Sequence, residues 1–216
     1  MSEAIPAATV VLARDGTDGL EVLMLRKNAK LSFGGMWVFP GGRVDPDDGE
    51  GEDGARRAAV REALEEADLV VDADGLVPFA HWTPPVPAPK RFATWFFLAP
   101  APDGAVTIDG GEIHDHVWVT PAVALQRQAA GEVELAPPTF VSLDRLSRSA
   151  DLAAALADAA AGPVEFYETH IGRAHDGSLM AVWHGDAGYE SGDLEAPGAR
   201  HRLHMRDGGW AYERSG

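Results

Sequence analysis

Short apolar runs alternate with turn-rich connectors along much of the chain. Residues 7–13 and 20–26 are two such runs, and the glycines of the connector 14–19 can adopt positive φ, so this region predicts a β-hairpin. The same pattern predicts strands at 76–82, 91–99, 116–119, 164–171, 179–183 and 200–206. The acidic segment 45–54 and the proline-rich segment 83–89 are predicted to be loops.

The strongest helix pattern covers residues 55–67, which are rich in Ala, Arg, Leu and Glu and contain no Gly or Pro. Apolar residues recur there at i, i+3, i+4 and i+7, and predict one buried stripe: Val60, Ala63, Leu64 and Ala67. At about 100° per residue, Glu62, Glu65 and Glu66 fall roughly opposite that stripe. Three carboxylates are therefore expected to converge on one small patch.

Further helices are predicted from Thr120-Pro121, from Pro138-Thr139, and over residues 151–161, where Gly162-Pro163 ends the pattern. Strands, one helix, more strands and then helices indicate an α+β fold with a mixed sheet. The predicted division is a main domain at 1–150 and a region at 151–216 that consists of a helix and a β-rich C-terminal extension.

Composition limits the classes of function. The 216 residues, 45% of them hydrophobic, suffice for one core and an appendage. With 18 Lys and Arg against 34 Asp and Glu, the formal net charge of −16 argues against binding nucleic acid polymers or anionic membranes. Cysteine is absent, which excludes disulfides and thiolate zinc sites. With no targeting pattern and no apolar stretch of about 18 residues, the sequence predicts a cytoplasmic protein.

The three helix carboxylates indicate a cation. Like charges packed on one face repel one another unless a cation neutralises them, and Mg²⁺ or Mn²⁺ prefers oxygen ligands of this kind. The alternative is a solvated acidic face on which Arg61 pairs with Glu65 and does little else.

The order of the motifs along the chain favours the metal site over the solvated acidic face. Phe39-Pro40-Gly41-Gly42, an acidic loop and Arg61-Glu62-Ala63-Leu64-Glu65-Glu66 together resemble the Nudix box. The resemblance covers residues 7–148 and implies an α/β/α sandwich that hydrolyses the diphosphate linkage of a nucleotide-like small molecule. It implies that Gly41 and Gly42 shape the loop at the ligand, that Arg61 orients a glutamate, and that the metals are held by Glu62, Glu65 and Glu66. A further acidic ligand or base is expected at Glu112, with Asp115 as the second candidate.

The box is imperfect in three respects. Asp68 stands where a glycine normally follows the paired glutamates, and Asp53 occupies the earlier acidic position in place of Glu. The loop between the glycines and the helix is also longer than usual, by about five residues.

Two segments bear on the substrate. Residues 35–45 and 81–97 are similar to segments of the peroxisomal-type coenzyme A and acyl-CoA diphosphatases. Lys90 and Arg91 place cations beside aromatic residues, so Arg91 is a candidate to bind a phosphate, and Trp82 or Trp95 is a candidate to stack on a base. The alternative is that the aromatic residues here are sheet core.

In the extension, a strand would place Arg200, Arg202, His204 and Arg206 on one face. The favoured interpretation of this basic stripe is a solvated or internally paired face, and the alternative is a grip for a remote phosphate or for a partner subunit. A homodimer through the extension is one hypothesis. The competing functions are a Nudix hydrolase of nucleoside triphosphates, dinucleotides or nucleotide sugars, and a non-catalytic Nudix-fold ligand sensor.

Overall fold

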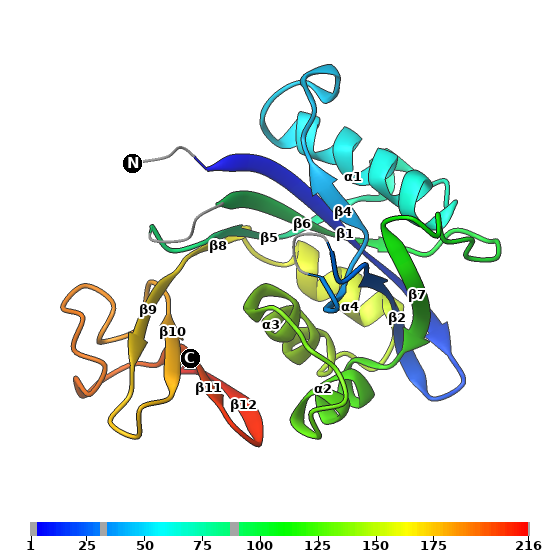
Figure 1. The fold of residues 1–216 in the computed structure, drawn as a ribbon. Coiled ribbons are helices and arrows are strands. Elements are labelled where there is room, and N and C mark those ends of the chain that lie inside the picture. Colours follow the sequence, from blue (N-terminus) through cyan, green and yellow to red (C-terminus); the bar gives the residue numbers. More distant parts are fainter. Residues whose placement is uncertain (1–3, 31–33, 87–90, 216) are drawn as a thin grey trace.

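The computed structural model describes residues 4–30, 34–86 and 91–215, and these form two β-sheets and four α-helices (Figure 1). The large sheet has the order β3-β2-β1-β6-β5-β8, with β4 paired to β1 and β7 paired to β2. Its strands are β1 (Ile5–Gly16), β2 (Gly19–Lys27), β3 (Trp37–Val38), β4 (Gly41–Arg43), β5 (Val77–Thr83), β6 (Phe92–Pro100), β7 (Ile113–Val119) and β8 (Glu165–Glu168). Lys90, the cation predicted beside Arg91, lies outside the described residues.

The predicted hairpin is confirmed. β1 and β2 pair antiparallel up to Gly16 and Gly19, where Gly19 has a φ of 111° that suits glycine. β1 also pairs in parallel with β6 along its length, from Ile5 opposite Phe92 to Ala13 opposite Pro100. The sheet is therefore mixed, as the order of elements predicted.

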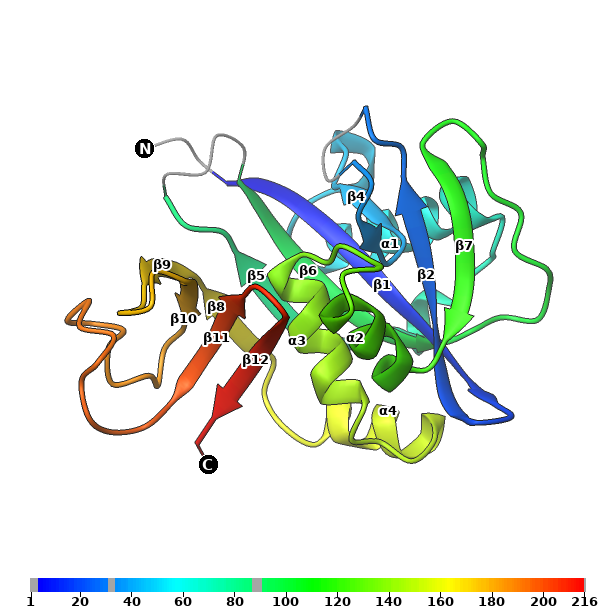
Figure 2. The same cartoon turned by 60° about the horizontal axis from the view of Figure 1, so that its bottom comes forward.

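Helices cover both faces of this sheet (Figure 2). Helix α1 (Gly51–Ala67) packs on one face against alternate residues of β1, among them Val10 and Leu12. The other face of β1, with Val11 and Ala13, packs in the same core as the helices α2 (Pro121–Ala129), α3 (Pro137–Leu146) and α4 (Leu152–Ala160). These layers form the predicted α/β/α sandwich.

The orientation of α1 differs from the prediction. The helix begins at Gly51, so part of the predicted acidic loop is its first turn. Its buried residues include Ala55, Ala58, Ala59, Ala63, Ala67 and Glu66. Leu64, predicted to lie in the buried stripe, is 47% exposed, because the small alanine side chains are the ones that let the helix lie close to the sheet. The predicted stripe is wrong at Leu64 but correct at Ala63 and Ala67, which are fully buried, and Glu66 lies on the buried side, not opposite to it.

The C-terminal segment adds to the large sheet before forming its own. The predicted strand 164–171 is divided: β8 pairs in parallel with β5, and after Thr169 the chain enters a four-stranded antiparallel sheet. The strands of that sheet are β9 (His170–Arg173), β10 (Leu179–Val182), β11 (His201–Arg206) and β12 (Gly209–Arg214). The junction between the sheets is aromatic, since Trp82 stacks on Tyr167 at 3.7 Å and meets Trp183 edge-on. The domain division predicted at 150 stays a prediction.

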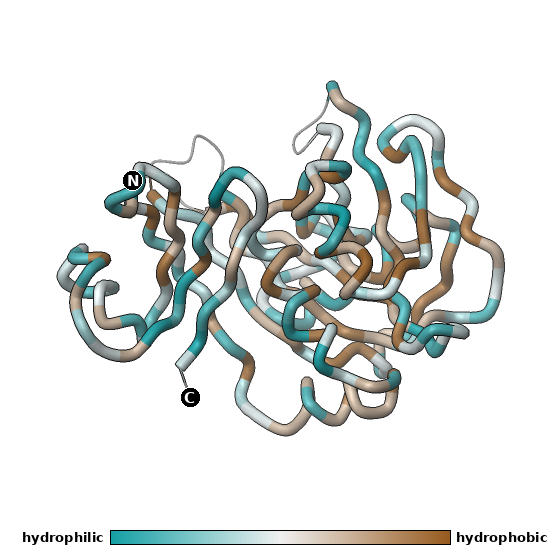
Figure 3. The backbone as a smooth tube through the Cα atoms, turned by 90° about the horizontal axis from the view of Figure 1, so that it is seen from below, coloured by the Kyte–Doolittle hydropathy of each residue, from teal (hydrophilic) through white to brown (hydrophobic). Residues whose placement is uncertain are grey.

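Hydrophobic segments follow the strands and helices in the interior, and hydrophilic residues gather in the outer loops (Figure 3). Across residues 4–30, 34–86 and 91–215, no helix is both long enough and apolar enough to cross a membrane.

Candidate active site

Two glycines bring strand β4 very close to helix α1 and to strand β1. A Cβ atom added at Gly42 would lie 2.2 Å from Oε1 of Glu62, and one added at Gly41 would lie 2.4 Å from the carbonyl oxygen of Ala8. Neither position therefore has room for a side chain. The close approach lets the Gly41 N–H donate a 2.9 Å hydrogen bond to Oε2 of Glu66.

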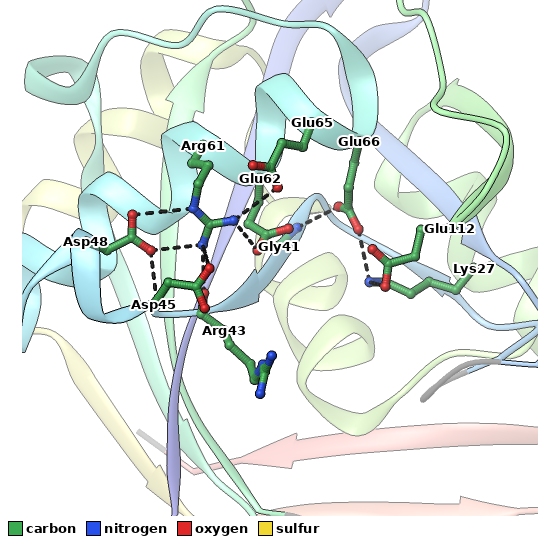
Figure 4. A network of polar contacts seen from close by, with 10 residues as sticks. All are labelled: Lys27, Gly41, Arg43, Asp45, Asp48, Arg61, Glu62, Glu65, Glu66 and Glu112. Carbon is green, nitrogen blue, oxygen red and sulfur yellow. Dashed lines mark hydrogen bonds and ion pairs between the residues drawn. The ribbon is translucent and has the colours of Figure 1, made fainter.

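A lysine lies among the predicted metal-binding carboxylates (Figure 4). Nζ of Lys27, the last residue of β2, is 2.9 Å from Oε1 of Glu66 and 3.9 Å from Oε1 of Glu112. The side chain of Glu66 is only 3% exposed, and that of Lys27 is 13% exposed. The sequence prediction did not include Lys27, because its place in the site depends on how β2 pairs with β7 and on the course of the loop before β7.

Burial controls the protonation of these groups. Burial raises the pKa of Glu66 to about 7, although Lys27 and the Gly41 N–H act in the opposite direction. Burial likewise raises the pKa of Glu62. For Lys27, burial favours the neutral amine, but the adjacent Glu66 outweighs it and the pKa of the ammonium is raised. The site thus holds buried carboxylates that gain stability from any nearby cation.

Arg61 is the centre of a second group of contacts. Its Nη1 donates to Oε1 of Glu62 at 2.8 Å and to Oε2 of Glu65 at 3.1 Å. Its Nη2 donates to Oδ2 of Asp48 and to the carbonyl oxygen of Arg43, both at 2.9 Å. The hydrogen bond from Arg61 lowers the pKa of Asp48, so Asp48 is an anion at neutral pH. In Figure 4 the Arg43 side chain points away from the carboxylates.

Most of the predicted site residues come together here. They are Gly41, Gly42, Arg61, Glu62, Glu65, Glu66 and Glu112. Asp115, the second candidate for the further acid, instead accepts a hydrogen bond from the N–H of His116.

Trp82 lies elsewhere. It is 3% exposed, and the ring of Tyr167 already stacks on it, so the prediction that Trp82 stacks on a base is wrong. The reason is its position at the junction of the two sheets, where its ring fills the core. Trp95 is half-buried beside His81 on the next strand. Arg91 donates from Nε to the carbonyl oxygen of Pro84 at 3.1 Å.

The basic stripe of the extension is paired internally. Arg202 is 3% exposed and forms two short contacts with Asp186, at 2.6 and 2.7 Å. Arg206 pairs with Asp176 at 3.2 Å. Arg200 and His204 also have partners, respectively the carbonyl oxygen of Ala196 and the side chains of Arg206 and Glu213. For Arg202 the interpretation as an internally paired residue is therefore correct, and the alternative that it grips a phosphate is excluded, because its charge is already balanced in the interior.

The donor set suits a hard divalent cation. Glu62, Glu65 and Glu66 offer only oxygen, and two of them are largely buried carboxyl groups, which fits Mg²⁺ or Mn²⁺. Among the described residues, no group of three or more acidic or histidine side chains is already arranged as metal ligands. Lys27 and Arg61 instead supply the positive charge beside these carboxylates.

A cavity of about 810 Å³ lies at the C-terminal extension. Its lining includes Glu165, Glu168 and Glu190 and no residue of α1. The lining also includes Arg214, His170, His184 and His201, so the cavity has mixed charge and contains none of the α1 carboxylates.

Comparison with known proteins gives a consistent result. A family model described as NUDIX domain matches residues 4–138. The chain is 31% identical over 182 residues to a Caenorhabditis elegans protein named "Putative nudix hydrolase 7", and the match spans 67% of this chain and 61% of that protein. It is 28% identical over 147 residues to the CTP pyrophosphohydrolase of Escherichia coli (strain K12), spanning 68% of this chain and 98% of that protein.

One solved structure resembles much of the fold. A NUDIX hydrolase from Alicyclobacillus acidocaldarius superposes with a TM-score of 0.68 at 24% sequence identity, covering 76% of this chain and all of that one. At this identity the likeness concerns the fold, and it extends beyond the residues that the family model matches.

Proposed function

Because the chain belongs to the NUDIX domain family, we propose that it is a metal-dependent hydrolase that cleaves the diphosphate linkage of a nucleotide-like small molecule. One observation carries this proposal. The Gly41 N–H fixes Glu66 from one side while Glu62 lies against Gly42, so the glycine pair and the helix carboxylates form one unit. A merely solvated acidic helix face would not bury Glu66 at 2% exposure.

The helix carboxylates would hold Mg²⁺ or Mn²⁺, the ligands being Glu62, Glu65 and Glu66. When bound, such ions neutralise the diphosphate oxygens and lower the pKa of a water molecule that attacks phosphorus. Arg61 keeps Glu62 and Glu65 in place through Nη1, and the Gly41 N–H fixes one oxygen of Glu66. Lys27 adds a positive charge beside Glu66, where it favours a polyanionic substrate.

Glu112 is proposed as the group that accepts the proton of the attacking water. Its side chain is 50% exposed, so water reaches it, and it lies 3.9 Å from Lys27. Asp115 lacks such a contact with the cluster in its observed position. We therefore expect Glu112→Gln to lower kcat by at least about tenfold, while Asp115→Asn, the matched control, leaves it unchanged.

The substrate proposed is coenzyme A or an acyl-CoA. Its support is the similarity of residues 35–45 and 81–97 to the peroxisomal-type diphosphatases. The Escherichia coli relative is named for its action on CTP, which makes nucleoside triphosphates the second candidate. The burial of Trp82 leaves Trp95, which is half-buried, as the candidate from the sequence for stacking on an adenine base.

Product analysis tests the proposal. Acyl-CoAs, ADP-ribose, NADH, dinucleoside polyphosphates and nucleoside triphosphates are incubated with the protein and Mg²⁺ or Mn²⁺. We expect two phosphate-bearing products from one class, and a loss of about 100-fold or more in Glu66→Gln. Tight ligand binding without metal-dependent turnover would replace the hydrolase with a non-catalytic ligand sensor.

A further inference from the structure

The cavity at the C-terminal extension lies where the two sheets meet. Its volume of about 810 Å³ is within the range of sites that hold a small organic molecule. Glu165 and Glu168 line it from β8 of the large sheet, and His201 lines it from β11 of the small one. Tyr189 and Glu190 come from the segment between β10 and β11. Because β8 leads directly into β9, the cavity bridges the two sheets (Figure 1).

His201 has a buried nitrogen that lacks a hydrogen-bond partner. The residue is 5% exposed, and its Nδ1 lies 2.8 Å from the carbonyl oxygen of His184. Since a carbonyl oxygen can only accept, Nδ1 carries the proton and Nε2 is left as an acceptor. In the part of the chain that the structure describes, Nε2 has no hydrogen-bond partner. Burial lowers the pKa of His201, so the ring is neutral at pH 7.

This nitrogen faces a second acceptor. Oε1 of Glu165 is 3.7 Å from Nε2 of His201, which is beyond hydrogen-bond distance. The other oxygen of Glu165, Oε2, accepts hydrogen bonds from the hydroxyl of Tyr167 and from Nη1 of Arg214. The cavity wall therefore presents two neighbouring acceptors, Nε2 and Oε1, without a donor for either of them.

Two further carboxylates give the cavity unbalanced negative charge. Glu168 and Glu190 are exposed, and within the described ranges their carboxylates form no ion pair and no hydrogen bond. Both lie near Tyr189, because burial and then their charges raise the pKa of its hydroxyl. Among the described residues, Arg214 is the only Lys or Arg in the lining, and it already pairs with Glu165. The unpaired charges of the cavity are therefore negative.

Aromatic rings form another part of the wall. Phe166 is 60% exposed, and the ring of Tyr189 is held in place by the ring of His170, which stacks on it at 4.2 Å. Aromatic faces attract organic cations and also pack against their methylene groups. A metal ion fits less well, since the described residues contain no group of three or more acidic or histidine side chains arranged to hold one.

We propose that this cavity binds a small organic cation. Its ammonium or guanidinium group donates hydrogen bonds to Nε2 of His201 and to Oε1 of Glu165, and one nitrogen can donate to both acceptors. Glu168 and Glu190 balance its positive charge. The net charge of −16 attracts any cation without selecting a place for it, whereas the unpaired buried nitrogen selects this cavity. The lining contains no residue of α1, so the proposal does not depend on the proposed function.

Titration calorimetry with diaminobutane and with agmatine tests the proposal. The salt concentration is about 0.15 M, which screens unspecific attraction to the net charge. We expect each amine to bind saturably at one site, and the uncharged butanediol of the same chain length not to bind. No saturable binding of either amine, equal binding of butanediol, or binding of inorganic phosphate or Zn²⁺ in place of the amines would overturn the proposal.

A double variant locates the site. Glu168→Gln with Glu190→Gln removes two exposed charges from the cavity and should lower the affinity for diaminobutane by about tenfold or more. The charge-matched control is Asp103→Asn with Asp207→Asn, which changes two exposed carboxylates outside the cavity and should bind as the wild type does. Equal losses in the two double variants would mean that only the net charge attracts the amine, and the proposal would be wrong.

The ring nitrogens of His201 provide a measurement that needs no substitution. In long-range proton–nitrogen NMR spectra, the Nε2 resonance should shift upfield when diaminobutane saturates the protein, because the nitrogen gains a donor. Butanediol should leave it in place, and an Nε2 resonance unchanged by saturating amine would contradict the proposed contact. Glu66→Gln should bind diaminobutane as the wild type does, so a failure of the proposed hydrolysis and a failure of amine binding are distinguishable.

Discussion

Asp68 ends helix α1 in the left-handed conformation, with a φ of 57° and a ψ of 36°. It is the one non-glycine residue with positive φ in the ranges 4–30, 34–86 and 91–215. This conformation costs an ordinary residue about 1 kcal/mol relative to glycine, and aspartate somewhat less. The preference of the motif for glycine at this position is therefore explained by the left-handed backbone conformation and not by a role in catalysis.

Asp68→Gly should therefore raise the free energy of unfolding by about 0.5–1 kcal/mol, measured by urea denaturation. The matched control is Ala130, which ends α2 at φ −76° and ψ −5°, where glycine has no advantage. Ala130→Gly should destabilise the protein. A decrease in both variants would mean that the side chain of Asp68 has a stabilising role of its own.

Lys27 can be tested in the same way. In Lys27→Met the carboxylate of Glu66 stays buried without its cation, so the metal-free protein should lose about 3 kcal/mol of unfolding free energy. Saturating Mn²⁺ should restore part of that loss, because the metal supplies the missing positive charge. Lys30→Met, at an exposed position three residues along, is the control, and equal thermal denaturation of the two variants would contradict this account.

At the scale of elements, α1 depends on small side chains. Its contact with the sheet is made by alanines such as Ala63, which is fully buried, and the neighbouring Leu64 is 47% exposed. Enlarging a tightly packed position forces the helix away from the strands, and with it the carboxylates that the same helix carries.

We expect Ala63→Leu to cost about 1–3 kcal/mol in urea denaturation. Leu64→Ala should change stability by less than about 1 kcal/mol, since about half of the Leu64 surface stays exposed to solvent. The apolar periodicity of the sequence predicts that Leu64 is buried. If Leu64→Ala lost more unfolding free energy than Ala63→Leu, the result would favour a buried Leu64 and contradict the observed packing.

At the scale of the whole molecule, one ion pair lies inside the C-terminal extension. The side chain of Asp186 is fully buried, that of Arg202 is 4% exposed, and they are 2.6 Å apart. Burial opposes the ionisation of Asp186, but hydrogen bonds from Arg202 and from backbone N–H groups lower its pKa to about 2. Arg202→Met should cost about 3–5 kcal/mol, because it leaves this carboxylate buried and unpaired.

The pair of Asp186 and Arg202 also makes the free energy of unfolding depend on pH. The pKa of Asp186 is lower in the folded than in the unfolded protein, so its contribution is complete above about pH 4 and is lost as the pH falls towards 2. The contribution to the free energy of unfolding is on the order of 2 kcal/mol. Chemical denaturation between pH 2 and 5 should show a weaker dependence in Asp186→Asn. Asp158→Asn, which alters the exposed pair with Arg145, should retain the wild-type dependence.

The sequence predicts local features of the site well and non-local ones poorly. Arg61 and Glu65 are four residues apart on one helix, and Glu66 is the next residue, so the motif and the helical period bring them together. Lys27 and Asp48 join them only through strand pairing and a folded loop, for which the chain has no local pattern. Trp82 failed as a prediction for the same reason, since its partner Tyr167 lies 85 positions away.

The stacked rings at the junction have an optical consequence. The ring centroid of Trp82 lies 3.7 Å from that of Tyr167 and 5.5 Å from that of Trp183. Trp82 and Tyr167 belong to strands of the large sheet, and Trp183 directly follows β10 of the small one. Excited indoles at such separations exchange energy with their neighbours, so their emission depends on whether the two sheets are docked. The intrinsic fluorescence of the protein therefore reports whether the two sheets are docked, and it comes from side chains outside the proposed active site.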